Sequence, residues 1–194
     1  MKCQKEIFEV IFYARGGQGA KVASEILAQA AASEGRFVQA FPEFGPERSG
    51  APVKTYLRVS DKKIRTHEPV VDPDAVAVLD ETILDSQDVL KNLDKNEALV
   101  INTRKSEYEI GEKLKSKGKK FEGKIYPIDA NGISMELVGQ MRPNTVILGK
   151  LVQISEITSL ESVIEKFRQV FEEKIGEEAT EKNIQAIEKA YDSI

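Results

Sequence analysis

Residues 7–20 carry the sequence IFEVIFYARGGQGA, a run of eight mostly apolar residues ended by a cluster of glycines. Such a run is typical of a buried strand that leads into a tight turn. From residue 20 to residue 34 apolar side chains recur at helical spacing, and Gly35 suits a left-handed helix stop. Residues 36–41 then predict a second strand. This order of strand, glycine loop, helix and strand is a βαβ unit with a Rossmann-like start.

Three later segments repeat the short apolar run that is typical of a strand covered on both faces. These segments are AVAVLD at 75–80, ALVIN at 98–102 and KIYPID at 124–129. Residues 53–59 alternate between apolar and polar side chains, which predicts a half-exposed strand, and the turn at 60–63 suggests a hairpin onto residues 64–66. A helix is predicted over 106–117, with Gly118 as its stop. Strands that alternate with helices indicate an α/β fold with three layers, α/β/α, around a mostly parallel, mixed sheet.

The C-terminal third is predicted to be helical. Residues 144–154 suit a buried helix, and Thr158 and Glu161 have the spacing of a capping box at the start of the next helix. Gly176 separates that helix from a last one over residues 177–192. The length suits one domain spanning residues 1–194.

The composition excludes several classes of protein. Charged residues make up 31% and hydrophobic residues 41%, as in ordinary globular proteins. A net charge of -4 gives no electrostatic reason to expect nucleic-acid binding. No apolar run approaches the ~20 residues that cross a membrane, and Glu6 and Glu9 interrupt the N-terminal apolar stretch, which argues against a signal peptide. We therefore expect a cytoplasmic protein, in agreement with the single cysteine.

The chain is poor in metal ligands and in acid–base groups. Cys3 and His67 are its only cysteine and histidine. A [4Fe–4S] cluster needs about four thiolates and a structural zinc site about four nitrogen or sulfur ligands. We therefore predict no metal site and no catalytic residue in this chain, and we expect His67 to lie on a loop or edge strand.

The glycine loop is the first candidate site, with Gly16, Gly17, Gln18 and Gly19 as its residues. Glycines let the backbone approach a ligand closely, and the start of the following helix suits a phosphate or a carboxylate. However, the dinucleotide fingerprint requires a third glycine where Val22 stands, and no Gly-Lys-Ser/Thr follows as in a P-loop. A tight turn that serves only helix–sheet packing is the alternative.

The second candidate site is the loop FPEFGPERSGAP at 41–52. Within it we select Glu47, Arg48 and Ser49 as ligand or interface contacts. Arginine and aromatic residues are enriched at interfaces, and the planar fork of Arg48 can pair with a phosphate or carboxylate. The alternative is a structured surface loop with Phe41 and Phe44 packed into the core.

Together these two segments resemble the gamma subunit of pyruvate and related 2-oxoacid:ferredoxin oxidoreductases. The resemblance rests on RGGQGA followed by a helix and on AFPEFGPERSGAPVKTYLRVSDKKIR at 40–65. PVVDPDAVAVLDETIL at 69–84 and the helix from Asn144 to Leu151 add to it, so it covers roughly residues 7–175. The sequence after the Gly-Pro-Glu of the proline loop is closer to the pyruvate and branched-chain type.

The resemblance implies a place in a larger enzyme. In that family the complex converts a 2-oxoacid and coenzyme A to acyl-CoA, carbon dioxide and reduced ferredoxin. Thiamine diphosphate, Mg and [4Fe–4S] clusters are expected in other subunits, with alpha, beta and delta-type subunits as partners. This chain would bind no cofactor by itself and would be inactive alone. Its implied role is to pack on the thiamine-bearing core and to assist coenzyme A access.

Two other functions remain open from the residues alone. The glycine turn after the first strand is compatible with a stand-alone nucleotide-binding α/β protein. The scarcity of catalytic side chains is compatible with a scaffold that has no role in redox chemistry.

Overall fold

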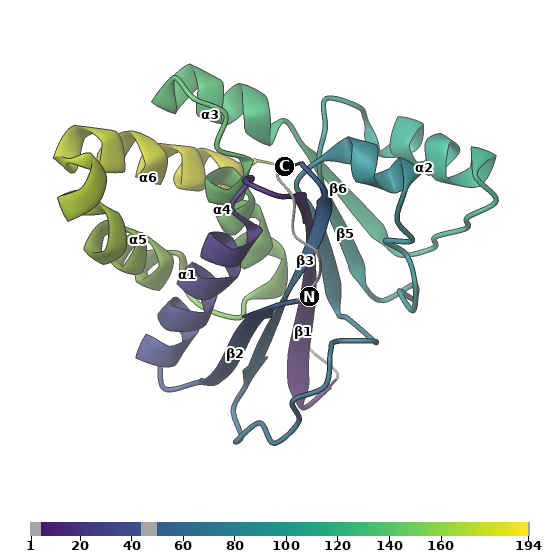
Figure 1. The fold of residues 1–194 in the computed structure, drawn as a ribbon, viewed down its shortest axis with the longest axis horizontal. Coiled ribbons are helices and arrows are strands. Elements are labelled where there is room, and N and C mark those ends of the chain that lie inside the picture. Colours follow the sequence, from purple (N-terminus) through teal and green to yellow (C-terminus); the bar gives the residue numbers. More distant parts are fainter. Residues whose placement is uncertain (1–4, 44–49, 194) are drawn as a thin grey trace.

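The structure, a computed structural model, describes residues 5–43 and 50–193 (Figure 1). The strands are β1 (Ile7–Arg15), β2 (Phe37–Pro42), β3 (Pro52–Ser60), β4 (Ala75–Val78), β5 (Ala98–Asn102) and β6 (Lys124–Ile128). The helices are α1 (Ala20–Ser33), the short 3-10 helix η1 (Glu81–Asp85), α2 (Glu107–Ser116), α3 (Ala130–Val138), α4 (Pro143–Ser155), α5 (Leu160–Ile175) and α6 (Glu177–Asp192).

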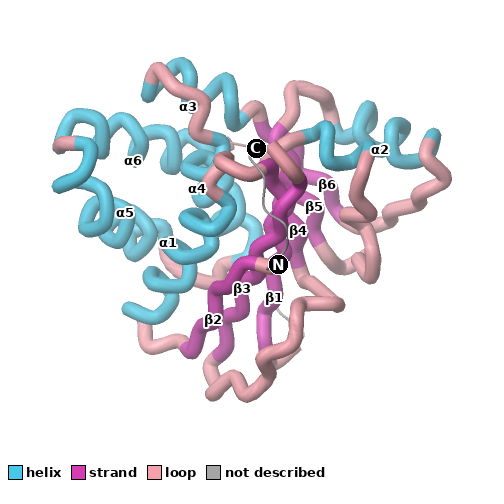
Figure 2. Tube along the Cα trace, viewed as in Figure 1, coloured by secondary structure: helices cyan, strands magenta, loops and turns pink. Residues whose placement is uncertain are grey.

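All six of these strands join one sheet, in the order β2-β3-β1-β4-β5-β6. Strands β1, β4, β5 and β6 are parallel, whereas β3 is antiparallel to both β1 and β2. The predicted unit of strand, helix and strand is therefore split, because β3 lies between β1 and β2. The mixed, mostly parallel sheet confirms the predicted fold class (Figure 2).

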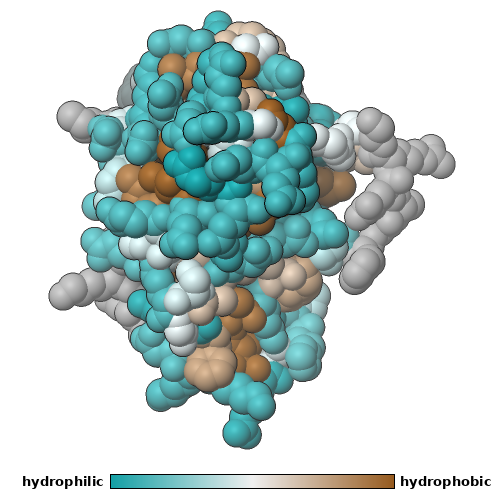
Figure 3. All heavy atoms as spheres, turned by 90° about the vertical axis from the view of Figure 1, so that its left-hand side faces the viewer, coloured by the Kyte–Doolittle hydropathy of each residue, from teal (hydrophilic) through white to brown (hydrophobic). Residues whose placement is uncertain are grey.

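Helices cover the sheet unequally on its two faces. Helices α1, α3, α4, α5 and α6 lie on one side, and α2 lies on the other (Figure 1). Side chains of β1 alternate between the two cores: Phe12 packs on the side of the five helices, and Ile11 and Tyr13 pack on the side of α2. The five-helix side is seen in Figure 3, where hydrophilic surface surrounds patches of apolar surface.

Three local predictions were wrong, each for a physical reason. Residues 53–59 do not form a half-exposed strand: Tyr56 packs in the core on the α2 side and Arg58 pairs with Glu9, so both are only 3% exposed. The predicted hairpin at 64–66 does not form, because β3 is already paired along both edges, with β1 and β2. The predicted capping box at Thr158 and Glu161 does not form either. Ser159 caps α5 by accepting a hydrogen bond from the Ser162 N–H at 3.1 Å, while the Thr158 hydroxyl donates to Glu34 at 2.9 Å.

The predicted helix stops are confirmed. Gly35, Gly118 and Gly176 all have positive φ angles, the region in which glycine is favoured. Helix α4 is buried on nearly every side and packs directly on α6. A β-carbon at Gly149 of α4 would overlap the carbonyl oxygen of Ile187, so glycine is what allows the two backbones to approach. Within the ranges given above, no helix has the length and apolar character needed to span a membrane.

Candidate functional site

The glycine loop lies at the carboxyl end of β1, in the middle of the sheet. The chain leaves β1 through α1 toward β2 on one side, whereas β4 pairs with β1 on the other side. The order of strands thus changes direction at β1. Ligands of open α/β sheets bind outside the carboxyl ends of strands at such a point, because the connections on either side leave a crevice there.

The two loops singled out in the sequence meet at this position. The Gly16 N–H donates to the Ala51 carbonyl at 2.9 Å, and the Gly50 N–H donates to the Gly16 carbonyl at 3.2 Å. The glycine loop and the end of the proline loop are therefore held together by backbone hydrogen bonds. Glu47, Arg48 and Ser49 lie outside the described residues.

Two glycines of the loop have left-handed backbone angles, with φ 96° at Gly17 and 80° at Gly19. Side chains rarely adopt this region. Gly19 also lacks space, since a β-carbon there would lie 2.7 Å from the Nδ2 atom of Asn144 at the start of α4. Gly17 faces open space instead, with nothing within 4 Å of a β-carbon. The glycines thus serve both alternatives that the sequence left open, namely close packing at Gly19 and an open backbone at Gly17.

Gln18 holds the loop closed through its side-chain amide. Its Oε1 accepts a hydrogen bond from the Arg15 N–H at 2.8 Å, and its Nε2 donates to Asp80 Oδ2 at 2.9 Å. Asp80 is the second residue after β4 and caps η1. Both ends of the Gln18 amide are therefore used inside the protein, and the residue positions the loop on the neighbouring strand.

Asp80 is kept ionised by the groups around it. Burial alone raises its pKa, but hydrogen bonds from Thr82 and Gln18 and the charge of Arg15 outweigh burial and hold the pKa below its usual value. Arg15 Nε lies 3.4 Å from Asp80 Oδ2, and the same guanidinium donates to Thr82 and to the Gly50 carbonyl. The Arg15 side chain is thus anchored within the loop.

Beside this loop lies an open hollow of about 570 Å³. Its lining comes from the glycine loop and the start of α1 on one side and from the ends of β2 and β3 on the other: Arg15, Gly16, Gly17, Gly19, Ala20, Lys21, Pro42, Val53, Lys54 and Thr55. The first turn of α1 has neither a side-chain cap nor an acidic residue. Its partial positive charge therefore faces the hollow without an internal anion.

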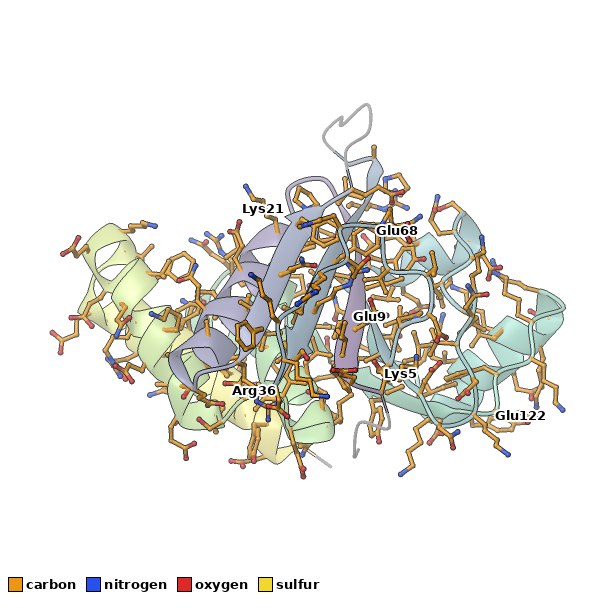
Figure 4. All side chains as sticks on the ribbon, turned by 90° about the horizontal axis from the view of Figure 1, so that it is seen from below. Lys5, Glu9, Lys21, Arg36, Glu68 and Glu122 are labelled. Atoms are coloured by element: carbon orange, nitrogen blue, oxygen red, sulfur yellow. The ribbon has the colours of Figure 1, made fainter. Side chains whose placement is uncertain are left out.

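Lys21 adds positive charge beside this hollow. It projects from the first turn of α1 (Figure 4), and its Nζ lies 3.7 Å from Glu25 Oε1. Such an exposed pair contributes little energy, so Lys21 can turn toward an incoming anion at small cost. Lys54 on β3 also lines the hollow, but its Nζ lies 3.2 Å from Glu43 Oε2 and over the Tyr13 ring.

Thr55 on β3 lines the hollow with a buried polar side chain. The residue is only 2% exposed, and its hydroxyl forms no hydrogen bond within the described part of the chain. Every fully enclosed side-chain nitrogen or oxygen of those residues does have a partner, so this hydroxyl is not fully enclosed by them. It is therefore placed to contact a ligand in the hollow.

Sequence reasoning found the glycine loop but missed Thr55, Asp80 and Asn144. Asp80 carried a signal, because it is the polar residue that ends the apolar run AVAVLD at 75–80. Phe41, for which two readings were open, is half-buried and packs on Tyr56 with ring centroids 5.3 Å apart; Phe44 lies outside the described residues. His67 lies on an exposed loop, as predicted.

The arrangement is suited to holding an anion. The hollow is lined by the backbone of the glycine loop, the Thr55 side chain and Lys21. Among the residues with described positions, no three His, Cys, Asp or Glu side chains gather in a way that could hold a metal ion.

Comparison with known proteins identifies the family and agrees with the fold. The family described as "Pyruvate ferredoxin/flavodoxin oxidoreductase" matches residues 9–193. The common gamma subunit of the pyruvate/ketoisovalerate oxidoreductases of Thermococcus kodakarensis is 44% identical over 185 residues, which cover 95% of this chain and 96% of the relative.

Solved structures of related proteins share this fold. The crystal structure of the pyruvate oxidoreductase subunit PORC from Thermotoga maritima has a TM-score of 0.84 at 36% identity, with 97% of both chains covered. A 2-oxoglutarate:ferredoxin oxidoreductase from Magnetococcus marinus, solved with 2-oxoglutarate, coenzyme A and succinyl-CoA bound, has a TM-score of 0.79 at 23% identity. It aligns with 96% of this chain over 31% of its own length, and at this identity the likeness concerns the fold alone.

Proposed function

The chain belongs to the pyruvate ferredoxin/flavodoxin oxidoreductase family as a gamma-type subunit, and from this premise we propose a specific role for it in the complex. The complex oxidatively decarboxylates pyruvate or a related 2-oxoacid with coenzyme A, forms acyl-CoA and carbon dioxide, and passes the two electrons to ferredoxin. The match along residues 9–193 carries this proposal. The Thermococcus kodakarensis relative is described as common to pyruvate and ketoisovalerate oxidoreductases, which supports assigning substrate choice to the partner subunits.

The chemistry is divided among subunits in this proposal. Thiamine diphosphate, Mg and the [4Fe–4S] clusters belong to alpha, beta and delta-type partners. One cysteine in the whole sequence supports this division, since a [4Fe–4S] cluster needs about four thiolates. The residues of this chain do not fit a [4Fe–4S] cluster. In this proposal the chain contributes no bond-making step, and the isolated chain is inactive.

The hollow beside the glycine loop contributes a contact to coenzyme A. Coenzyme A carries phosphate groups, and phosphate is the ligand that an uncapped helix start and free backbone amides favour. The first turn of α1, the Thr55 hydroxyl and the Lys21 ammonium support this assignment. The Magnetococcus marinus enzyme, which shares the fold, was solved with coenzyme A bound.

The test uses the assembled complex with Thr55→Val or Lys21→Gln in this chain. Thr55→Val keeps the shape of the side chain and removes only the hydroxyl. We expect either variant to raise the KM for coenzyme A by about three- to tenfold, the loss of one hydrogen bond or charge contact, with the KM for pyruvate unchanged. Lys182→Gln on α6, which removes an exposed pair with Glu178, serves as the matched control.

The possible outcomes distinguish the proposed coenzyme A contact from the role of the chain as gamma subunit. If assembly is normal and the KM for coenzyme A stays at the wild-type value in both variants, the hollow does not contact coenzyme A, while the role as gamma subunit is unaffected. If the variant chains fail to enter the complex on gel filtration, the hollow belongs to a subunit interface instead.

A further inference from the structure

A second hollow, of about 280 Å³, lies on the helical side of the molecule and has no part in the proposed function. It is formed where the start of α4 meets α5 and α6. Its lining residues are Val138, Gln140, Arg142, Asn144, Thr145, Phe167, Phe171, Ile175, Ala179 and Asn183. The two phenylalanine rings pack on each other with centroids 4.6 Å apart. The hollow therefore combines an aromatic wall with a polar end, which is formed by Arg142, Asn144, Thr145 and Asn183.

The polar end holds a side chain without a partner. Thr145 is only 3% exposed, and its hydroxyl forms no hydrogen bond within residues 5–43 and 50–193. Since no fully enclosed side-chain nitrogen or oxygen of that part lacks a partner, this hydroxyl must face the hollow. Asn183 beside it is buried too, and its Nδ2 donates to the Ala179 carbonyl at 2.7 Å.

The charges around this polar end have one sign. Among the described residues that line the hollow, none is an aspartate or a glutamate. Arg142, at the start of α4, donates from Nη2 to Gln140 Oε1 at 2.8 Å, and within the described chain no carboxylate pairs with it. Helix α4 has thirteen residues, no side-chain cap and no acidic residue in its first turn. Its positive end therefore points to the same place as the guanidinium.

We propose that this hollow is a binding site for a small organic carboxylate with a short apolar body. The carboxylate lies at the start of α4, with Arg142 and the Thr145 hydroxyl as its donors, and the apolar body lies against Phe167 and Phe171. Charge-assisted hydrogen bonds of this kind are stronger than neutral ones. The volume is at the small end of the range for ligand pockets, which excludes larger cofactors.

The site is linked physically to the glycine loop through Asn144. This residue lines the hollow, and its side-chain amide is the group that a β-carbon at Gly19 would meet at 2.7 Å. A ligand that moves the Asn144 side chain would therefore change the packing around Gly19. The backbone amide resonance of Gly19 is therefore a second reporter of ligand binding, at a residue outside the hollow.

The experiment titrates the full chain with isovalerate at millimolar concentrations and follows backbone amide resonances by NMR. Isovaleramide, which has the same shape without the charge, is the matched probe. We expect isovalerate to shift the resonances of Asn144, Thr145 and Gly19, and to bind at least tenfold more tightly than isovaleramide. Thr145→Val and Arg142→Gln should each weaken isovalerate binding by about tenfold.

Controls make each outcome decisive. Lys182→Gln on α6, which removes an exposed pair with Glu178, should leave isovalerate binding unchanged. Arg142 is exposed, so Arg142→Gln remains informative if Thr145→Val fails to fold. Equal binding of the two probes, no effect of both variants, or no resonance shift at all would overturn the proposal. So would binding to the isolated chain that disappears in the assembled complex, because a partner subunit would then cover this face.

Discussion

The side-chain amide of Asn144 occupies the space that a β-carbon at Gly19 would need, with Nδ2 at 2.7 Å from that position. Helices α1 and α4 are far apart in the sequence, and both begin at this contact. Because Asn144 lines one hollow and Gly19 the other, the contact also joins the two candidate sites. The loop geometry therefore depends on a residue more than a hundred positions away in the chain.

The first prediction follows from this contact. Gly19→Ala should lower the free energy of unfolding by about 2–4 kcal/mol, because it adds an overlap with Asn144 to the cost of a left-handed backbone. Gly17→Ala, in the same loop with φ 96° but open space around it, should cost only about 1–2 kcal/mol. Urea unfolding of the full chain measures both values.

The double variant Gly19→Ala/Asn144→Ala isolates the overlap. The double variant should lose less free energy of unfolding than the sum of the losses of the two single variants. Additive effects would mean that the contact with Asn144 does not limit position 19.

The second prediction concerns the loop closure by Gln18. Gln18→Glu replaces the donor to Asp80 with a carboxylate, so two negative charges would face each other across the loop. The change should destabilise the chain by about 1–3 kcal/mol at neutral pH. It should also raise the pKa of Asp80 from its lowered value, since a like charge favours the protonated form.

The pH dependence supplies the check on Gln18→Glu. As the pH falls below about 4, one carboxyl group takes up a proton and can donate to the other, so the stability difference from wild type should shrink. Gln29→Glu, at an exposed position on the same helix, should change stability by less than about 0.5 kcal/mol at either pH. A pH-independent effect of Gln18→Glu would contradict the assigned contact.

The third prediction uses Glu81, the residue after Asp80. Burial alone raises its pKa, but hydrogen bonds from Lys105, Thr103 and Lys113 outweigh burial and lower it to about 2. A carboxyl group whose pKa is lower in the folded state stabilises the protein above its unfolded pKa, and this stability is lost as the pH falls from about 4.5 toward 2. Glu81→Gln should therefore cost about 1–2 kcal/mol at pH 7 and progressively less below pH 4.5.

Thermal unfolding of both proteins across this pH range gives the difference directly. Glu112→Gln, which removes an exposed partner of Lys115, should have almost no effect. A constant difference between wild type and Glu81→Gln from pH 7 to pH 3 would show that the carboxylate charge of Glu81 is not what stabilises this end of the sheet.

The fourth prediction tests the packing of α4 on α6. A β-carbon at Gly149 would overlap the backbone of Ile187, and backbone atoms cannot move aside as a flexible side chain can. Gly149→Ala should destabilise the chain by about 3 kcal/mol or more. Gly111→Ala in α2 meets open space and should instead stabilise it by about 0.5–1 kcal/mol. Equal effects of the two substitutions on urea unfolding would refute this account of the helix contact.

Local patterns in the sequence predicted most elements of this fold. The apolar run before RGGQG, the helical spacing after it and the three later apolar runs correspond to β1, α1, β4, β5 and β6. The hairpin at 64–66 was predicted wrongly because the pairing of β3 with both β1 and β2 is not visible in local alternation. At Thr158 and Ser159 two possible capping residues are adjacent, and the folded backbone places Ser159 at the start of α5, although both hydroxyls donate to Glu34.

The candidate site was predicted less completely than the fold. Glycine spacing located the loop, but the contacts that shape it join residues far apart in the chain, such as Gln18 with Asp80 and Gly19 with Asn144. Alternation placed Thr55 on one face of its strand, yet only the packed structure shows that its hydroxyl lacks a partner. Spacing along a sequence carries no information about such distant pairs.

The most direct test of the role as gamma subunit is pyruvate-dependent, coenzyme A-dependent reduction of ferredoxin by reconstituted subunits. Three samples are compared: this chain alone, the alpha, beta and delta-type partners without it, and the full set. We predict that neither the chain alone nor the partners alone reduce ferredoxin at the full rate, and that mixing restores it. Full activity of the partners without this chain, or turnover by this chain alone, would contradict the account.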